Sequence, residues 1–216
     1  MQPITDVVKN LIIINVIVFI GTMTLPESYK EMGYLYFFMS DKFQPFQIVT
    51  SMFMHAGFQH LFFNMISLFF LGPTVERVLG PKRFFLLYII AGLGATAAHL
   101  GVDYYEYYQL TSKYSIEALS AQSIDYYRLM NIGALGASGA VYGVVIAFAT
   151  IFPNQRLILF PIPIPVKAMY VAIGLVLIGI ISGVGSLQPG IAHYAHLGGA
   201  LTGFILIHIW GKANLR

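Results

Sequence analysis

The sequence contains no cysteine and very little charge. None of its 216 residues is Cys, and only 10% are Asp, Glu, Lys or Arg. The lack of cysteine excludes disulfide bonds and thiol catalysis. The scarcity of charge, with 57% hydrophobic residues and a mean hydropathy of +0.74, lies far outside the range of soluble domains. The chain is therefore predicted to be a membrane protein.

Six apolar stretches are long enough to cross a lipid bilayer. A span needs about 18 or more mainly apolar residues, and its backbone groups must pair within the segment, so these stretches are predicted helices. The first lacks the strongly basic start and the small-residue cleavage site of a signal peptide, so we expect it to be retained. The prediction is an all-α, polytopic membrane protein, a six-transmembrane-helix bundle forming a single domain over residues 1–216, with no soluble domain attached. The predicted helices cover residues 7–25, 58–75, 84–102, 132–152, 166–186 and 191–211.

The distribution of basic residues predicts the orientation in the membrane. With the N-terminus inside, the inner segments carry twice as many basic residues as the outer ones, as the positive-inside rule requires. We therefore expect a multi-pass protein with both termini in the cytoplasm, located in a bacterial inner membrane. The net charge of +3 reflects this asymmetry and gives no reason to expect a nucleic-acid partner. The inner residues are Lys9, Arg77, Lys82, Arg83, Arg156, Lys167, Lys212 and Arg216, and the outer ones are Lys30, Lys42, Lys113 and Arg128.

The connections between the predicted helices differ in composition. The first outer connection, residues 26–57, is rich in Tyr and Phe with few charges, which favours a segment lying in the membrane interface. The second, Asp103–Asn131, is polar and rich in tyrosine, so an amphipathic helical excursion and a solvated linker are equally open. An inner connection contains Pro161, Pro163 and Pro165 and cannot be helical. No internal repeat is visible, which argues against an inverted-repeat transporter.

Acidic residues are missing from the interiors of the predicted spans. None of the nine carboxylates lies well inside one, and Glu76 and Asp103 lie at span ends. A buried Ser-His-Asp triad therefore has no candidate acid. Ionisable side chains at membrane depth are functional candidates, because burying them without partners is costly. The polar groups in or near the spans are His55, His60, Asn64, His99, Ser138, His193, His196 and His208.

Four of these side chains are expected at one depth in the outer half of the bilayer. Ser138 lies about six residues into its predicted span, or about 9 Å at 1.5 Å per residue. His196 lies about five residues into its own span. His60 and Asn64 are four residues apart and share one helix face at the start of another span. Two histidines near the ends of their spans do not clearly join this layer: His99 and His208.

Small residues predict that the helices carrying Ser138 and His196 approach closely. A Ser-His pair needs hydrogen-bond reach of about 2.6–3.2 Å, and small-residue faces allow helices to come that close. Tyr142 follows Ser138 by four residues, so its ring is expected beside the imidazole, which it would hold by stacking in place of an acid. The glycine pairs that form these faces are Gly139 with Gly143, and Gly199 with Gly203.

This arrangement predicts acyl-transfer chemistry. Ser138 would attack a carbonyl carbon while neutral His196 takes its proton and later returns it to the leaving amine. The oxyanion that forms needs preorganised donors, and the side chains of His60 and Asn64, with the backbone amide of Ser138, are the candidates. That amide lies near the start of a helix, where the macrodipole also favours negative charge.

Simpler interpretations exist for each residue taken alone. A Gly-x-Ser-Gly stretch in a membrane helix usually serves packing, and a lone histidine on an apolar face is more often structural. His193 and His196 could bind a metal with His55 or His60, but no intramembrane carboxylate or thiolate completes such a site, so no metal or other cofactor is expected. A small transporter or channel would need a polar stripe through both leaflets, and the inner halves of the spans supply little beyond His208. The shared depth of serine, histidines and asparagine favours chemistry.

Together these motifs resemble those of the rhomboid intramembrane serine proteases. The resemblance runs in order from about Gln44 to Gly203, although the Trp-Arg pair common in the family's first loop is not found in residues 26–46. The motifs are Gly136-x-Ser138-Gly139, His60-x-x-x-Asn64 and Ala195-His196-x-x-Gly199-x-x-x-Gly203, and the stretches Gln44–Thr50 and Glu76-Arg77-x-x-Gly80 are similar too.

The resemblance implies a minimal six-span rhomboid core with no extra helix or cytosolic domain. It implies that Ser138 is the nucleophile, that His196 is the base, and that His55 lies beside a water-filled cavity. It also implies that the substrates are membrane proteins cut within or near a transmembrane segment. A catalytically inactive relative that binds membrane helices is the first alternative, and a small transporter is the second. The residues implied to border the oxyanion hole are Gly136, His60, Asn64 and the amide of Ser138.

Overall fold

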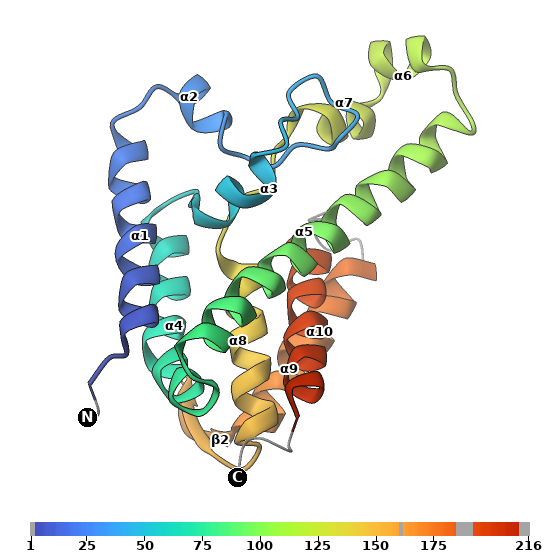
Figure 1. Cartoon of the computed structure of the whole chain (residues 1–216). Coiled ribbons are helices and arrows are strands. Elements are labelled where there is room, and N and C mark those ends of the chain that lie inside the picture. Colours follow the sequence, from blue (N-terminus) through green and yellow to red (C-terminus); the bar gives the residue numbers. More distant parts are fainter. Residues whose placement is uncertain (1–2, 160–161, 185–191, 212–216) are drawn as a thin grey trace.

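The computed structural model describes residues 3–159, 162–184 and 192–211, and most of these residues are helical (Figure 1). Long helices form a bundle, and short helices lie in the outer connections. This confirms the predicted fold class, an all-α polytopic membrane bundle. The helices are α1 (Asp6–Met23), α2 (Glu27–Glu31), α3 (Gln47–Thr50), the 3-10 turn η1 (Ser51–Phe53), α4 (Phe58–Leu79), α5 (Pro81–Thr111), α6 (Ile116–Gln122), α7 (Ile124–Asn131), α8 (Ser138–Ile151), α9 (Ala168–Val184) and α10 (Ala192–Trp210).

The outside of the bundle is apolar. Large hydrophobic side chains are exposed on several helices, among them Ile17, Phe70, Ile178 and Leu201. Contiguous exposed apolar surface of this kind is rare on soluble monomers and is covered by lipid in membrane proteins. Within the described residues, α1, α4 and α5 are long and apolar enough to cross a membrane. The chain is an integral membrane protein.

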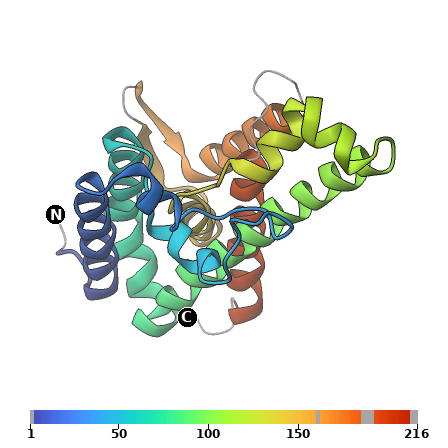
Figure 2. The ribbon, with the colours of Figure 1, turned by 90° about the horizontal axis from the view of Figure 1, so that it is seen from above.

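Helix α8 lies at the centre of the bundle (Figure 2), where it packs against α4, α5, α9 and α10. It begins at Ser138 and not at residue 132 as predicted. The helix cannot continue backwards, because Gly136 has φ 135°, which is not a helical conformation. The preceding segment is extended instead, and Ala134 forms an antiparallel bridge with Leu35. The 14 residues of α8 span about 21 Å, which is less than the roughly 30 Å hydrocarbon core.

Helix α5 is longer than predicted. It runs from Pro81 to Thr111 over 31 residues, whereas the hydropathy pattern limited it to residues 84–102. The polar stretch after residue 102 therefore continues the helix, and Asp103, expected at a span end, lies inside α5 with only 3% of its surface exposed. The rest of the second outer connection contains α6 and α7, so it is a helical excursion (Figure 1).

The inner connection folds into a hairpin that was not predicted. Strands β1 (Arg156–Leu159) and β2 (Ile162–Lys167) pair antiparallel, with Arg156 opposite Lys167 and Pro165 opposite Ile158. The alternating prolines that exclude a helix are compatible with a short two-stranded hairpin, where not every N–H is needed. Because β2 extends to Lys167, α9 begins two residues later than predicted. The predicted boundaries at residues 186 and 191 lie outside the described residues.

Gln47 organises the first outer connection. Its side chain is buried, with 1% exposed, and its Oε1 accepts hydrogen bonds from the backbone N–H of Gln44 at 3.0 Å and of Tyr36 at 3.4 Å. Its Nε2 donates to the carbonyl oxygens of Lys42 at 3.0 Å and Met32 at 3.3 Å. One amide thus satisfies four backbone groups of a loop that has little regular structure. This loop then supplies the bridge to Ala134 next to Gly136.

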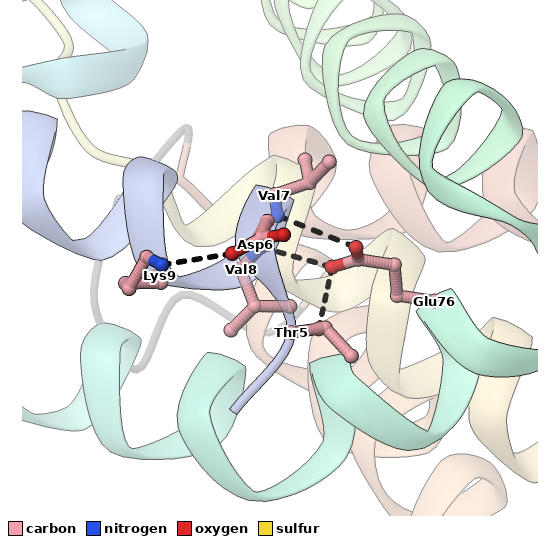
Figure 3. A network of polar contacts seen from close by, with 6 residues as sticks. All are labelled: Thr5, Asp6, Val7, Val8, Lys9 and Glu76. Carbon is pink, nitrogen blue, oxygen red and sulfur yellow. Dashed lines mark hydrogen bonds and ion pairs between the residues drawn. The ribbon is translucent and has the colours of Figure 1, made fainter. Parts of the chain in front are cut away.

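Glu76 attaches α1 to α4 (Figure 3). The N-cap residue of α1, Thr5, makes no capping bond within its own helix. Glu76 of α4 takes this role: its carboxylate accepts from the Thr5 hydroxyl at 2.5 Å and from the backbone N–H of Val8 at 3.0 Å and of Val7 at 3.3 Å. Glu76 is 5% exposed, and the free amides of a helix N-terminus stabilise its negative charge there.

Candidate active site

Ser138 and His196 lie in contact between α8 and α10. The distance from Ser138 Oγ to His196 Nε2 is 2.8 Å, which is a good hydrogen bond. For the hydroxyl to donate, Nε2 must be unprotonated and Nδ1 must carry the imidazole proton. The pair therefore has the geometry of a nucleophile with its general base.

Glycines allow the two helices to come close enough for this contact. A Cβ atom added at Gly199 would overlap the carbonyl oxygen of Gly139. One added at Gly203 would lie 2.5 Å from the carbonyl oxygen of Gly143. The backbones of α8 and α10 thus touch along two successive helical turns, at the four glycines singled out in the sequence. This backbone contact sets the spacing between Ser138 and His196.

Tyr142 holds the plane of the imidazole. Its ring stacks on the ring of His196, with centroids 4.3 Å apart and planes inclined by 9°. Tyr142 lies one helical turn after Ser138, so the same helix that carries the hydroxyl also carries the group that orients the base. A stacked phenol restricts rotation of the imidazole without needing a buried charge.

The predicted oxyanion donors lie at the start of α8 and, as His60, near the start of α4. Ser138 is the first residue of α8, and the first N–H groups of a helix have no partner within it. The helix dipole adds positive potential at this end of α8. Gly136 supplies the remaining room: a Cβ there would lie 2.7 Å from His60 Cε1, 2.9 Å from His60 Nε2 and 3.5 Å from Ser138 Oγ. The imidazole of His60 therefore lies directly against the loop that precedes the serine.

Asn64 lies on the same face of α4 but its amide is engaged. Its Nδ2 donates to the carbonyl oxygen of His60 one turn earlier, at 3.0 Å, and the residue is 6% exposed. The amide does not reach Ser138 directly in this state, so a contact with an oxyanion would need a change of side-chain rotamer. Catalytic hydrogen bonds often form only in the complex with substrate.

The ring of His55 packs against the ring of His60. It lies just before α4, 6% exposed, and its ring meets that of His60 edge-on with centroids 5.1 Å apart. Its Nδ1 lies 3.3 Å from the carbonyl oxygen of Phe53. Burial, with a smaller contribution from the nearby His60, lowers the pKa of His55 to about 4. His55 is therefore neutral at pH 7.

A cavity of about 250 Å³ opens beside Ser138 and His196. Its wall also includes His99 and Asp103 of α5 and Arg128 of α7. Sequence reasoning left His99 out of the layer, treated Asp103 as a span end and gave Arg128 no role in the site. The signal that identifies the first two is their i, i+4 spacing, which puts both polar side chains on one face of a helix.

Two further histidines lie on α10, one at each end of the helix. His208 lies at the other end of α10 and contacts the carbonyl oxygen of Phe204 through Nδ1 at 2.9 Å. His193 lies one turn before His196 on α10. In the part of the chain that the structure describes, no three His, Cys, Asp or Glu side chains are grouped so that they could hold a metal ion.

Comparison with known proteins gives the family. The model of the Rhomboid domain matches residues 42–213, a range that contains every site residue described above. The chain belongs to the rhomboid family. The predicted family is thereby confirmed.

Several curated rhomboid proteins are similar to this chain. Rhomboid protease AarA of Providencia stuartii is 33% identical over 162 residues, covering 72% of this chain and 52% of that protein. Rhomboid protein 1, mitochondrial, of Saccharomyces cerevisiae is 28% identical over 201 residues, covering 93% of this chain and 52% of that protein. RHOMBOID-like protein 2 of Arabidopsis thaliana is 31% identical over 170 residues, covering 76% of this chain and 41% of that protein. The rhomboid chain thus spans about half the length of the first two of these relatives.

Proposed function

We propose that this rhomboid protein is an intramembrane serine endopeptidase that hydrolyses peptide bonds within or near the transmembrane segments of membrane proteins. The observation that carries the proposal is the 2.8 Å contact between Ser138 Oγ and His196 Nε2, in a chain whose matched relatives include a named rhomboid protease. No cofactor takes part. The bilayer and a transmembrane substrate are the partners.

The reaction proceeds in two halves. Ser138 Oγ attacks the scissile carbonyl carbon as its proton passes to His196 Nε2, and the tetrahedral intermediate then expels the amine, which takes that proton. Water from the adjacent cavity next attacks the acyl-enzyme ester, with His196 again accepting a proton and returning it to Ser138. The stacked ring of Tyr142 keeps the imidazole in place through both halves.

The oxyanion is stabilised at the start of α8. The backbone N–H of Ser138 and the imidazole of His60 are the donors closest to the reacting position, and Asn64 joins them when its amide leaves the His60 carbonyl. Gly136 keeps the space for the oxygen open. Preorganised donors in a site with little water are the largest contribution to acyl-transfer catalysis in many enzymes.

The site faces the outer side of the membrane in this proposal. The excess of Lys and Arg in the inner segments supports cytoplasmic termini, and the Ser138 end of α8 then points outward. A bacterial inner membrane is the proposed location. The matched relatives also include mitochondrial proteins, whose membrane is the alternative.

Cleavage of a model transmembrane substrate tests the proposal. In liposomes, Ser138→Ala and His196→Ala should each lower cleavage at least about 1,000-fold, since removing either member of a Ser-His pair abolishes most of the rate. A fluorophosphonate probe should label the wild type and leave Ser138→Ala unlabelled.

Matched controls come from the same bundle. Ser67→Ala and His208→Ala remove a serine of α4 and a histidine of α10 whose side chains hydrogen-bond to a backbone carbonyl of their own helix, that of Phe63 and that of Phe204. Both should cleave like the wild type. Undiminished cleavage by Ser138→Ala and His196→Ala would show that the pair is not catalytic, and no cleavage by a folded wild type would favour an inactive helix-binding relative.

A further inference from the structure

The cavity beside Ser138 extends to a second polar cluster that the proposed reaction does not use. His99 and Asp103 lie on α5, and Arg128 lies on α7, which covers α5 from the outer side. All three side chains line the same cavity as Ser138 and His196. A substrate segment bound at the serine would therefore have this cluster within the same cavity.

Asp103 is the buried centre of this cluster. It is 3% exposed, and its Oδ2 lies 3.6 Å from His99 Nε2. Its other oxygen, Oδ1, is fully buried and has no hydrogen-bond partner among the residues that the structure describes. Buried carboxylate oxygens without partners are costly and rare, so Asp103, which lines the cavity, gains a partner for this oxygen when its carboxyl group turns toward a donor that enters.

Arg128 does not fill that position. Its Nη2 is directed at two other carboxylates, Glu106 at 3.6 Å and Asp125 at 3.8 Å. The arginine is thus paired with two carboxylates that do not line the cavity, and Asp103 is the carboxyl group that the cavity presents within the described residues. A carboxyl group at this place attracts cations and hydrogen-bond donors.

From this geometry we infer that Asp103 is a specificity-determining residue, which accepts a hydrogen bond from an ammonium, guanidinium or carboxamide side chain of the substrate close to the cut bond. The inference rests on the proposed function, because it names a substrate feature of the same site. It gives the unpartnered oxygen of Asp103 its partner.

The helix geometry sets the distance from the cut bond. Ala95 of α5 lies against Gly139, the residue after Ser138. Asp103 follows Ala95 by two turns, or about 12 Å along the helix axis. An extended peptide advances about 3.4 Å per residue. The recognised side chain therefore lies about three to four residues from the scissile bond, or somewhat nearer when it is as long as lysine.

A substrate series on the wild-type protein tests the inference without any mutation. Model substrates would differ at one position, scanned over four residues on each side of the cut, with Lys, Gln, Met or Glu at that position. Met is as long as Gln and one atom shorter than Lys, and it donates no hydrogen bond. We expect kcat/KM for Lys, or for both Lys and Gln, to exceed that for Met about tenfold or more at one or two positions, as for hydrogen bonds to charged groups. Glu should be cleaved slowest there. Equal cleavage of all four at every position would overturn the inference.

Two isosteric variants locate the effect. Asp103→Asn should bring the Lys to Met ratio close to one. Asp125→Asn removes a carboxylate that contacts the same arginine but does not line the cavity, so it should keep the wild-type ratio. An unchanged Lys to Met ratio in folded Asp103→Asn would contradict the inference. If that variant fails to fold, the substrate series on the wild-type protein still tests the inference. Failure of the proposed function looks different, because the wild type and Ser138→Ala would then be equally inactive on every substrate.

Discussion

At the scale of single residues, the geometry of the site depends on the missing side chain of a glycine as much as on the side chains that are present. Gly136 has φ 135°, and its missing side chain leaves room for the ring of His60 next to Ser138 Oγ. The same residue ends the extended segment and allows α8 to begin at the serine. One glycine therefore sets the position of the proposed nucleophile, its free amide and the neighbouring donor.

Gly136→Ala should inactivate the protein without unfolding it. The added Cβ would lie 2.7 Å from His60 Cε1 and would need a backbone conformation that L-residues rarely adopt. A shift of about 1 Å in a catalytic group costs about 100-fold, so we expect at least that loss in kcat/KM against the model substrate.

Gly101→Ala is the matched control, because a Cβ at that position in α5 meets no atom within 4 Å. Its activity should equal that of the wild type, and its stability should be the same or slightly higher, since alanine is the better helix former. Wild-type kcat/KM in Gly136→Ala would show that this close contact does not shape the site.

At the scale of elements, a short central helix is held by longer ones. Helix α8 has 14 residues and α5 has 31, so the serine end of α8 is surrounded by helices and loops that extend past it. Backbone contact with α10 fixes one side. Helix α1 is fixed differently: apart from side-chain packing, it is attached to α4 by the carboxylate of Glu76 at its N-terminus.

Glu76→Gln should loosen α1 and lower stability. The amide cannot accept from the Thr5 hydroxyl and the α1 amides as strongly as a carboxylate does, and hydrogen bonds to charged groups contribute about 1.5–3 kcal/mol. Thermal unfolding in detergent should show a lower Tm, with cleavage at low temperature close to the wild type, because Glu76 follows His60, the site residue of α4, by about 24 Å along the helix axis.

Asp6→Asn provides the comparison for this measurement. Asp6 forms an exposed ion pair with Lys9 at the same helix end (Figure 3), and exposed pairs contribute at most about 1 kcal/mol. Its Tm should change less than that of Glu76→Gln. Equal Tm values for the wild type and Glu76→Gln would mean that the carboxylate does not anchor α1.

At the scale of the whole molecule, polar groups lie inside and apolar groups lie outside. The bundle exposes Ile, Leu and Phe to its surroundings and encloses the serine, the histidines and a polar cavity. Lipid would surround the exterior, and the cavity is the place from which the proposed hydrolysis would draw its water. The α6–α7 excursion and the first outer connection lie on the side of the bundle where α8 begins (Figure 1), the helix end that carries Ser138.

Cysteine labelling tests the proposed orientation, since the natural sequence has no cysteine to interfere. Tyr114→Cys lies in the outer excursion and Asn154→Cys in the inner connection, and both positions are exposed. In intact cells, a membrane-impermeant maleimide should label Tyr114→Cys and not Asn154→Cys, and permeabilisation should expose both. The reverse pattern would place the termini and the site on the opposite sides.

The sequence predicted the spans well where hydropathy governs them and less well where the chain is polar. Apolar helices begin close to the expected residues at Asp6 and Phe58. The sequence did not predict the tyrosine-rich continuation of α5 or the hairpin that begins at Arg156. Tertiary contacts and local strand pairing decide the structure of such segments. Asp103 was therefore misplaced, and its burial in the cavity went unnoticed.

By itself, the sequence determined that the chain enters a membrane, that its spans are helices, and which residues carry usable chemistry, because these follow from local composition and spacing. Only the tertiary structure decided that Ser138 begins its helix, that its hydroxyl lies 2.8 Å from an imidazole 58 residues away, and that Asp103 lines the same cavity. The physical reason is that these distances depend on how closely separate helices pack. The glycine-to-glycine contact between α8 and α10 depends on both helices together and cannot be read from either segment alone.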